Sequence, residues 1–369
     1  MMTSGARLRA IYEFRPVDHL VRKEFYIWSE AIERWKTEGL PDDYQEQNLF
    51  QFDPPASASA GLALGWCEPP FVPEYEAKVV REEGNTEIVQ DKAGRWLRCF
   101  KGRRHGFMPD YIKHAVSGPK DWEEDVLPRL DPTTASRYEK LADTCTNAKD
   151  LRETEDRIVI QQMVGGYMYL RALMGPEDLL YGVYDMPELI HKMMQAWADL
   201  MDAGLERVQA EVDLDEISMG EDICYNAGSL ISPEHIREFL FPYYRHVLER
   251  ARARQERKIY FTVDTDGDAP AVIDLYLELG MDQMWPFEVA SGCDVVEIGK
   301  QYPGLIMSGG IDKRILAEGK KAIDEHVEHI LPAMVKRGGY TPTCDHGVPD
   351  NVSLENYLHY RKRVCELDG

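Results

Sequence analysis

A thiol, a carboxyl group and an imidazole stand in three consecutive positions, Cys344, Asp345 and His346, within the stretch YTPTCDHGV at 340–348. Each of these groups can act as a nucleophile, a general acid or base, or a metal ligand. A simple chain reversal needs none of them, because glycine and proline suffice. The stretch therefore indicates a reactive site, provided that other segments bring further groups to it.

Acidic or polar residues, and in one case a glycine, also follow four segments that have the pattern of buried strands. They are Glu221, Tyr225 and Asn226 after DEISMG (215–220), Asp264 and Asp266 after KIYFTV (258–263), Glu288 after DQMWPF (282–287), and Gly310 after GLIMSG (304–309). Each one alone also has a structural explanation as a turn residue, a helix cap or a small buried residue. Their shared position after strands favours one common site. Its candidate catalytic residues are Glu221, Asp264, Asp266 and His346, and its candidate substrate contacts are Tyr225, Asn226, Glu288 and Gly310.

From about residue 155 onward, short β-type runs alternate with amphipathic helical patterns. The runs are RIVIQQM (157–163), the four segments named above and GYTPT (339–343), and LVRKEFYIW (20–28) is the candidate first strand. The helical patterns cover 184–210, 231–253, 316–337 and 353–367, with Asp185 and Ser232 as candidate caps of the first two. Six strand-then-helix units in series imply a parallel sheet wrapped by helices.

Two architectures satisfy this alternation, the closed (β/α)8 TIM barrel and the open doubly wound sheet. The open sheet normally carries a glycine-rich phosphate turn, and MVGGYMYL at 163–170 lacks the G-x-G-x-x-G spacing. We therefore expect an α/β barrel, as one domain over residues 1–369, with the main repeats in 151–369. The N-terminal part, 1–150, is expected to include a β-hairpin insertion at about 75–115. In a barrel, the loops after the strands line the active site, and the polar residues stand there.

The net charge indicates which classes of binding partner are expected, and the cysteines indicate the cell compartment. The 369 residues include 43 Lys and Arg against 65 Asp and Glu, a formal net charge of −22. Such a surface repels phosphate backbones and anionic lipids, so a small-molecule substrate is expected and nucleic acid and membranes are disfavoured. The seven cysteines are scattered without a C-x-x-C pair, which is typical of a cytoplasmic protein with reduced thiols. Five of them, at 67, 99, 145, 293 and 365, are expected to be structural.

Three longer stretches resemble the uroporphyrinogen decarboxylase superfamily. They are GEDICYNAGSLISPEHIREFLFPYYR (220–245), GGIDKRILAEGKKAIDEHV (309–327) and GGYTPTCDHGVPDNVSLENYLHY (338–360). The resemblance covers residues 155–369 well and extends more weakly to the N-terminus. It implies a (β/α)8 barrel, in agreement with the alternation of strands and helices.

The resemblance implies one of two chemistries. Tetrapyrrole decarboxylation, which needs no cofactor, goes with an N-terminal R-Q-A-G-R motif, whereas this chain has VRKEFYIWSEA at 21–31. Methyl transfer uses a corrinoid carried by a separate protein, and a zinc ion held by an H-x-C-G element and a distal cysteine. By this resemblance Asp264 and Asp266 take the positions of the histidine and cysteine, and Cys344 that of the distal cysteine. The candidate fourth ligand is Glu221 or His346.

Two carboxylates would give such a centre hard oxygen ligands in place of nitrogen and sulfur. The metal could then be zinc, manganese or magnesium, and a site without metal is also an alternative. The favoured function is a metal-assisted methyltransferase that moves a methyl group between a small methoxy or methylthio substrate and a corrinoid protein. The first alternative is a cofactor-free decarboxylase, a lyase in which Arg103 and Arg104 of KGRRHGF hold substrate carboxylates. The second alternative is a barrel that only binds a ligand.

Overall fold

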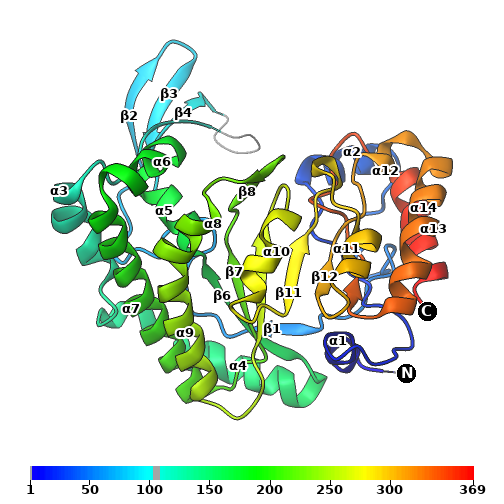
Figure 1. The fold of residues 1–369 in the computed structure, drawn as a ribbon. Helices are drawn as coiled ribbons and strands as arrows, with labels where there is room; N and C mark the ends of the chain where they lie inside the picture. The colour runs from blue at the N-terminus through cyan, green and yellow to red at the C-terminus, as the bar shows by residue number, and fades with distance from the viewer. Residues whose placement is uncertain (1, 103–108) are drawn as a thin grey trace.

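The computed structural model describes residues 2–102 and 109–369, and its centre is a curled parallel sheet (Figure 1). The strands lie in the order β1, β6, β7, β10, β11, β12, β13, with bounds Ser57–Ser59, Ile158–Val164, Glu216–Gly220, Tyr260–Thr265, Gln283–Pro286, Ile306–Ser308 and Tyr340–Thr341. Six of these coincide with the predicted strands of the main repeats. Because the spatial order follows the chain and every pair is parallel, the predicted α/β barrel class is confirmed.

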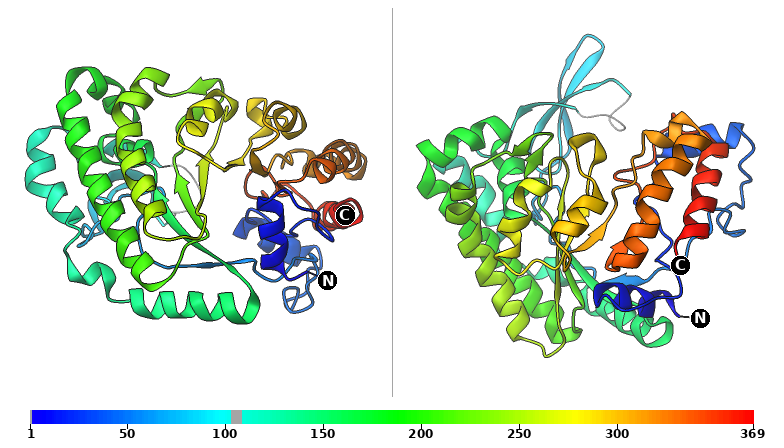
Figure 2. Two further views of the ribbon diagram at one scale, coloured as in Figure 1. Left: turned by 60° about the horizontal axis from the view of Figure 1, so that its bottom comes forward. Right: turned by 45° about the vertical axis from the view of Figure 1, so that its right-hand side comes forward.

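The two faces of the sheet differ because side chains alternate along each strand. One row of register partners is apolar and fully buried: Met163, Met219, Val263, Met284 and Met307. The adjacent row is polar: Gln162, Ser218, Thr262 and Gln283. Helices cover the outer face of the sheet (Figure 2), so the apolar row packs outward and the polar row lines the barrel interior.

The helices that follow the strands are close to those predicted. They are α5 (Gly166–Met174), α6 (Pro176–Asp185), α7 (Pro187–Glu211), α9 (Phe241–Ala253), α10 (Pro270–Leu277), α11 (Val295–Gln301), α13 (Lys320–Arg337) and α14 (Leu354–Leu367). Ser232 accepts a hydrogen bond from the His235 backbone N–H, as expected of a cap. The Asp185 cap prediction is wrong, because Asp185 ends α6 and Met186 precedes α7. Among the described helices, none is both long and apolar enough to span a membrane.

The segment 20–28, predicted to be the first strand, does not form a regular strand. Its backbone pairs with Val348 at Ile27 through a single parallel bridge. On its other side, the Asp53 N–H donates to the Arg22 carbonyl oxygen (2.8 Å). The segment therefore lies between the last and first strands of the sheet, in the position of an eighth strand.

The N-terminal part carries a four-stranded antiparallel sheet beside the barrel mouth (Figure 1). Its strands are β2 (Lys78–Glu83), β3 (Thr86–Gln90), β4 (Trp96–Phe100) and β5 (Asp110–Lys113). The predicted hairpin is its central pair, and the turn between β3 and β4 is closed by a hydrogen bond from the Gly94 N–H to the Asp91 oxygen (3.1 Å). Arg103 and Arg104 lie outside the described residues.

Candidate active site

The carboxyl ends of the strands form a mouth with a partly aromatic wall. Gly220, Asp264 and Trp285 are register neighbours on β7, β10 and β11, so their side-chain positions face the same side. Trp66 covers Gly220, since a Cβ there would lie 3.0 Å from the indole. The ring centroids of Trp66 and Trp285 are 6.0 Å apart, and Phe25 lies 5.1 Å from Trp285. Asp264 therefore stands beside an aromatic surface.

Asp264 and Asp266 are carboxyl groups that favour the protonated form. Burial raises the pKa of Asp264 well above its usual value, and the charges of Asp266 and Asp222 raise it further. Burial, together with Asp222 and Glu288, raises the pKa of Asp266 to about 7. The pKa of Asp266 is raised although 41% of its side chain is exposed. The mouth thus holds two carboxyl groups that can donate a proton at neutral pH.

His346 is adjacent to one of these carboxyl groups. Its Nε2 lies 3.8 Å from Oδ2 of Asp266, and its Nδ1 lies 3.4 Å from the Tyr26 hydroxyl. Burial, and then the charge of Lys313, lowers the pKa of His346. A neutral imidazole next to a carboxyl group that titrates near neutrality forms a pair that can relay a proton.

Glu288 and Asp345 are held by backbone groups and by one lysine. Glu288 accepts a hydrogen bond from the Gly267 N–H (3.0 Å), and Asp345 accepts from the Val289 and Lys313 N–H groups (3.0 and 3.1 Å). The Lys313 ammonium lies 3.5 Å from Glu288 and 3.8 Å from Asp345. These contacts fix the loops after β11 and β12 against each other and leave a cation near the acidic mouth.

On the other side of the mouth, Arg171 of α5 forms an ion pair with Asp222 (2.5 Å). Asp222 has a left-handed backbone, with φ of 44°, and its N–H donates to the Asp264 carbonyl oxygen (3.1 Å). The loop after β7 is therefore tied both to β10 and to the helix after β6. The ion pair also reduces the negative charge that faces Asp264.

Glu221, a predicted catalytic residue and metal ligand, points away from this mouth. Its carboxyl Oε1 accepts hydrogen bonds from the hydroxyls of Tyr244 (2.6 Å) and Tyr276 (2.7 Å), which belong to α9 and α10. Strand alternation explains the orientation, because Gly220 shares the face of Asp264 and the next residue must take the opposite face. Burial raises the pKa of Glu221 to about 7.

Cys344, the predicted distal ligand, is also directed elsewhere. The residue is fully buried, and its thiol lies near Glu24, Tyr360 and Arg361. Its backbone N–H donates to Glu24 (2.7 Å). Burial and then the charge of Glu24 raise the pKa of its thiol well above the usual value, so the thiol stays protonated. The structure thus does not bring the four predicted ligands together, and within residues 2–102 and 109–369 no group of three His, Cys, Asp or Glu side chains is arranged to hold a metal ion.

Of the remaining predicted substrate contacts, two lie at the rim of the mouth and one serves internal packing. Tyr225 is 48% exposed, and Asn226 follows it in the exposed turn between β8 (Cys224–Tyr225) and β9 (Gly228–Ser229). Gly310 is buried with φ of 77°, and a Cβ there would lie 2.2 Å from Val295. Gly310 therefore serves close packing, whereas Tyr225 and Asn226 are available at the rim.

Sequence reasoning missed several side chains that the fold places at the mouth. Trp66 and Cys67 follow β1, whose run of three small residues gives no strand pattern. Cys67, expected to be structural, is exposed. The surrounding protein, and then the charges of Asp264 and Asp222, raise the pKa of its thiol to about 11. Because β1 has no strand pattern in the sequence, no signal marked Trp66 or Cys67 as residues of the mouth.

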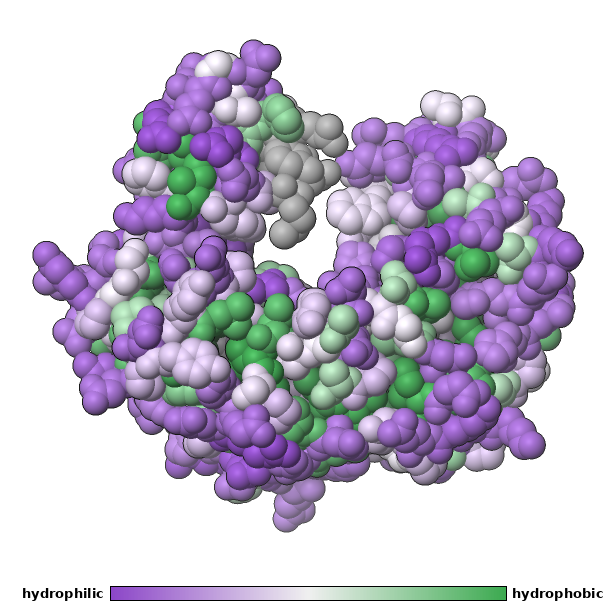
Figure 3. Space-filling view, turned by 45° about the horizontal axis from the view of Figure 1, so that its top comes forward, coloured by the Kyte–Doolittle hydropathy of each residue, from purple (hydrophilic) through white to green (hydrophobic). Residues whose placement is uncertain are grey.

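The mouth is open to solvent. Figure 3 shows a hollow at this end of the molecule, between the four-stranded sheet and the C-terminal part of the barrel. Three aromatic residues near it keep exposed surface: Tyr26 (38%), Trp28 (36%) and Tyr225 (48%). The arrangement as a whole offers aromatic contacts, carboxyl groups with raised pKa, and an entrance visible in the surface view.

Comparisons with known proteins point to one family. The family model described as uroporphyrinogen decarboxylase (URO-D) matches residues 104–367. A uroporphyrinogen decarboxylase from Streptomyces coelicolor is 26% identical over 179 residues, which is 45% of this chain and 47% of that protein. One from Hydrogenobaculum is 22% identical over 157 residues, 41% of this chain and 43% of that protein. The chain thus spans about half the length of the curated relatives it matches.

Among solved structures, a methyltransferase from Methanosarcina mazei is similar over 99% of both chains, with a TM-score of 0.61 and 14% sequence identity. At that identity the likeness shows the fold alone. The fold of this chain is therefore one that a methyltransferase also uses.

Proposed function

This chain belongs to the uroporphyrinogen decarboxylase family, and from that premise we propose that it is a methyltransferase. In this proposal it moves a methyl group between a small methoxy or methylthio compound and a corrinoid carried by a separate protein. The observation that carries the proposal is the pair Asp264 and Asp266, two carboxyl groups with raised pKa beside an aromatic wall.

The proposed role of these carboxyl groups is to protonate the leaving atom. When a methyl group leaves an ether, the C–O bond breaks and its electrons stay on the oxygen. Asp264 or Asp266 gives its proton to that oxygen, so the demethylated product leaves as a neutral hydroxyl compound. His346, 3.8 Å from Asp266, then returns a proton to the carboxylate from solvent. Trp66, Trp285 and Phe25 pack against the body of the substrate and exclude water from it.

A reduced corrinoid, when presented by its partner protein, would supply the nucleophile that accepts the methyl group. The open hollow and the exposed rings of Tyr26, Trp28 and Tyr225 fit a flat cofactor approaching from solvent. The predicted metal ligands do not fit a zinc centre, because the Glu221 carboxyl group bonds to Tyr244 and Tyr276 and the Cys344 thiol is buried near Glu24 and Tyr360. No step is therefore assigned to a metal.

Charge supports a small neutral substrate over a polycarboxylate. Asp222, Asp264, Asp266 and Glu288 gather at the mouth, while the nearby cations Arg171 and Lys313 already contact acidic partners. A substrate with several carboxylates would have to compete with these acidic partners for the two cations. Decarboxylation stays the second candidate, because the matched relatives are decarboxylases and a protonated carboxyl group can also protonate carbon after loss of CO2.

The test is methyl transfer from methoxybenzene or dimethyl sulfide to reduced free cobalamin, followed by the absorbance change of the cobalamin. We expect turnover with the native protein and at least about a hundredfold loss in both Asp264→Asn and Asp266→Asn. Asp42→Asn, at a carboxyl group whose side chain is 95% exposed, is the matched control and should keep full activity. Release of CO2 from uroporphyrinogen, with no methyl transfer, would assign the decarboxylase function instead.

A further inference from the structure

A cavity of about 710 Å³ opens at the seam of the barrel, separate from the acidic mouth. It lies between the segment 20–28 and residues 44–55. Among the described residues, backbone pairing across this seam is limited to Arg22 and Asp53. Pro54 and Pro55 follow directly and have no N–H to continue a ladder, so the seam stays open beyond that point.

The walls of the cavity are mostly apolar. The side chains that set this character are Ile32, Tyr44, Phe50, Phe52, Pro54 and Pro55. The volume is within the range of small-molecule sites, which are usually apolar clefts with a few polar groups that orient the ligand. The polar groups of the lining therefore decide which ligand fits.

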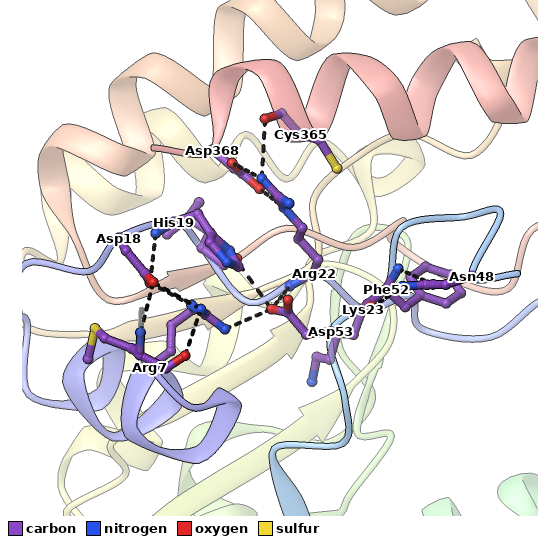
Figure 4. Close-up of polar contacts among 12 residues, drawn as sticks. Arg7, Asp18, His19, Arg22, Lys23, Asn48, Phe52, Asp53, Cys365 and Asp368 are labelled. Atoms are coloured by element: carbon purple, nitrogen blue, oxygen red, sulfur yellow. Dashed lines mark hydrogen bonds and ion pairs between the residues drawn. The ribbon is translucent and has the colours of Figure 1, made fainter. Parts of the chain in front are cut away.

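Lys23 is the lysine in the lining, and its ammonium group has no partner in the described part of the chain. Figure 4 shows its side chain extending away from the bonded network of Arg7, Asp18 and Asp53. The side chain keeps exposed surface. The surrounding protein lowers the pKa of Lys23, while the charges of Glu216 and Glu24 act in the opposite direction. A lysine without an ion pair gains from an anionic ligand, because a charge-assisted hydrogen bond is stronger than a neutral one.

The carboxylates around Lys23 are each held by other groups. Asp53 accepts hydrogen bonds from Arg7 (3.1 Å) and from the Arg22 N–H (3.0 Å). Glu24 accepts from the Cys344 N–H (2.7 Å), and Glu216 accepts from the Tyr12 hydroxyl (2.6 Å). Among the described charged side chains of the lining, Lys23 is therefore the one without a hydrogen bond or ion pair, and it favours a negatively charged ligand.

We propose that this cavity binds a small aromatic carboxylate, whose anionic group pairs with Lys23 and whose ring packs among Phe50, Phe52 and Tyr44. The site is independent of the proposed methyl transfer. It adjoins the mouth at Tyr26, which lines the cavity and whose hydroxyl lies 3.4 Å from His346.

The test uses naphthalene-2-carboxylate and its neutral amide as probes, with isothermal titration calorimetry on the full chain. We expect the carboxylate to bind saturably at one site and the amide to bind at least about tenfold more weakly, since an ion-paired hydrogen bond is lost. This comparison needs no variant. Equal affinity for the two probes, or no saturable binding of the carboxylate, would overturn the proposal.

Variants then assign the binding to Lys23. Lys23→Met should bind the carboxylate at least about tenfold more weakly than the native chain and should bind the amide equally well. Lys23→Arg should keep most of the affinity for the carboxylate. Lys36→Met, at an exposed lysine of α2 (Ser29–Thr37), is the matched control and should bind like the native chain. Unchanged carboxylate binding by a folded Lys23→Met protein would place the ligand elsewhere.

Discussion

Nε2 of His346 lies 3.8 Å from Oδ2 of Asp266, although 80 positions separate the two residues in the chain. The pair joins the loop after β10 to the segment after β13, so it depends on the barrel being curled. Both groups are shifted toward their neutral forms, since burial raises the pKa of Asp266 to about 7 and lowers that of His346. Their contact is the basis of the first prediction.

Methyl transfer should be fastest below neutral pH and decline as the pH rises through about 7. The reason is that Asp266 can donate a proton only while it is protonated, and its pKa is raised to about 7. The measurement is the rate between pH 5 and 9. Asp266→Asn should remove this decline along with most of the rate, while Asp42→Asn keeps the native profile. A native rate that rises across this range would show that Asp266 acts as a base.

The barrel architecture was predictable, and so was the grouping of Asp264, Asp266 and His346 at one end of it. Strand patterns and their order carried that information, because parallel strands place their carboxyl ends together. The direction of the Glu221 side chain was not predicted. It follows from strand alternation, because Glu221 comes directly after Gly220, which shares the face of Asp264. Cys344 could not be placed, because the segment after β13 leaves regular strand geometry and its backbone N–H bonds to Glu24, from the other end of the chain.

Stability should fall between pH 4.5 and 7 because of Glu221. The folded state raises the pKa of this buried carboxyl group from 4.5 to about 7, so in this window the unfolded chain releases the proton that the folded chain keeps. The contribution is fully present below pH 4.5 and is lost as the pH passes 7, a change of about 3 kcal/mol. Urea unfolding at pH 4, 5, 6, 7 and 8 measures it.

Glu221→Gln should make this dependence shallower by about 3 kcal/mol, because the amide stays neutral and its oxygen still accepts from Tyr244 and Tyr276. The raised pKa values of Asp264 and Asp266 should keep the rest of the dependence. Glu33→Gln, at an exposed carboxyl group on α2, is the control and should leave the native slope unchanged. If the slope of Glu221→Gln equals that of the native protein, the carboxyl group is ionised in the fold at pH 5.

Metal content should not depend on Cys344. The thiol is fully buried and its pKa is raised by burial, so it lacks both the access and the thiolate form that a zinc ligand needs. Elemental analysis of the native protein and of Cys344→Ser, purified without added metal, should give the same molar ratio. A metal that is present in the native protein and lost in Cys344→Ser would restore the predicted distal ligand and require the segment 340–348 to rearrange.

Gly165→Ala should destabilise the protein by about 2 kcal/mol, as expected for an inserted methyl group in a packed interior. A Cβ at Gly165 would lie 1.7 Å from Oε2 of Glu221, so the carboxyl group would have to leave its tyrosine partners. The conformation of Gly165 is not the obstacle, because its φ is −70°. The Gly220 carbonyl oxygen (2.8 Å) and the Glu221 Cα (2.9 Å) would also lie too close to the added Cβ. The glycine pair of MVGGYMYL thus gives room to Glu221 and, at Gly166, to Tyr244, in place of a phosphate turn.

Gly118→Ala is the matched control for this variant. Its backbone is extended, with φ of 176°, and a Cβ there meets no atom within 4 Å in the described structure. We expect its free energy of unfolding to change by less than about 0.5 kcal/mol, as at a surface position. If Gly165→Ala were as stable as Gly118→Ala, the Glu221 side chain would not occupy the space beside β6, and its two tyrosine hydrogen bonds could not form as described.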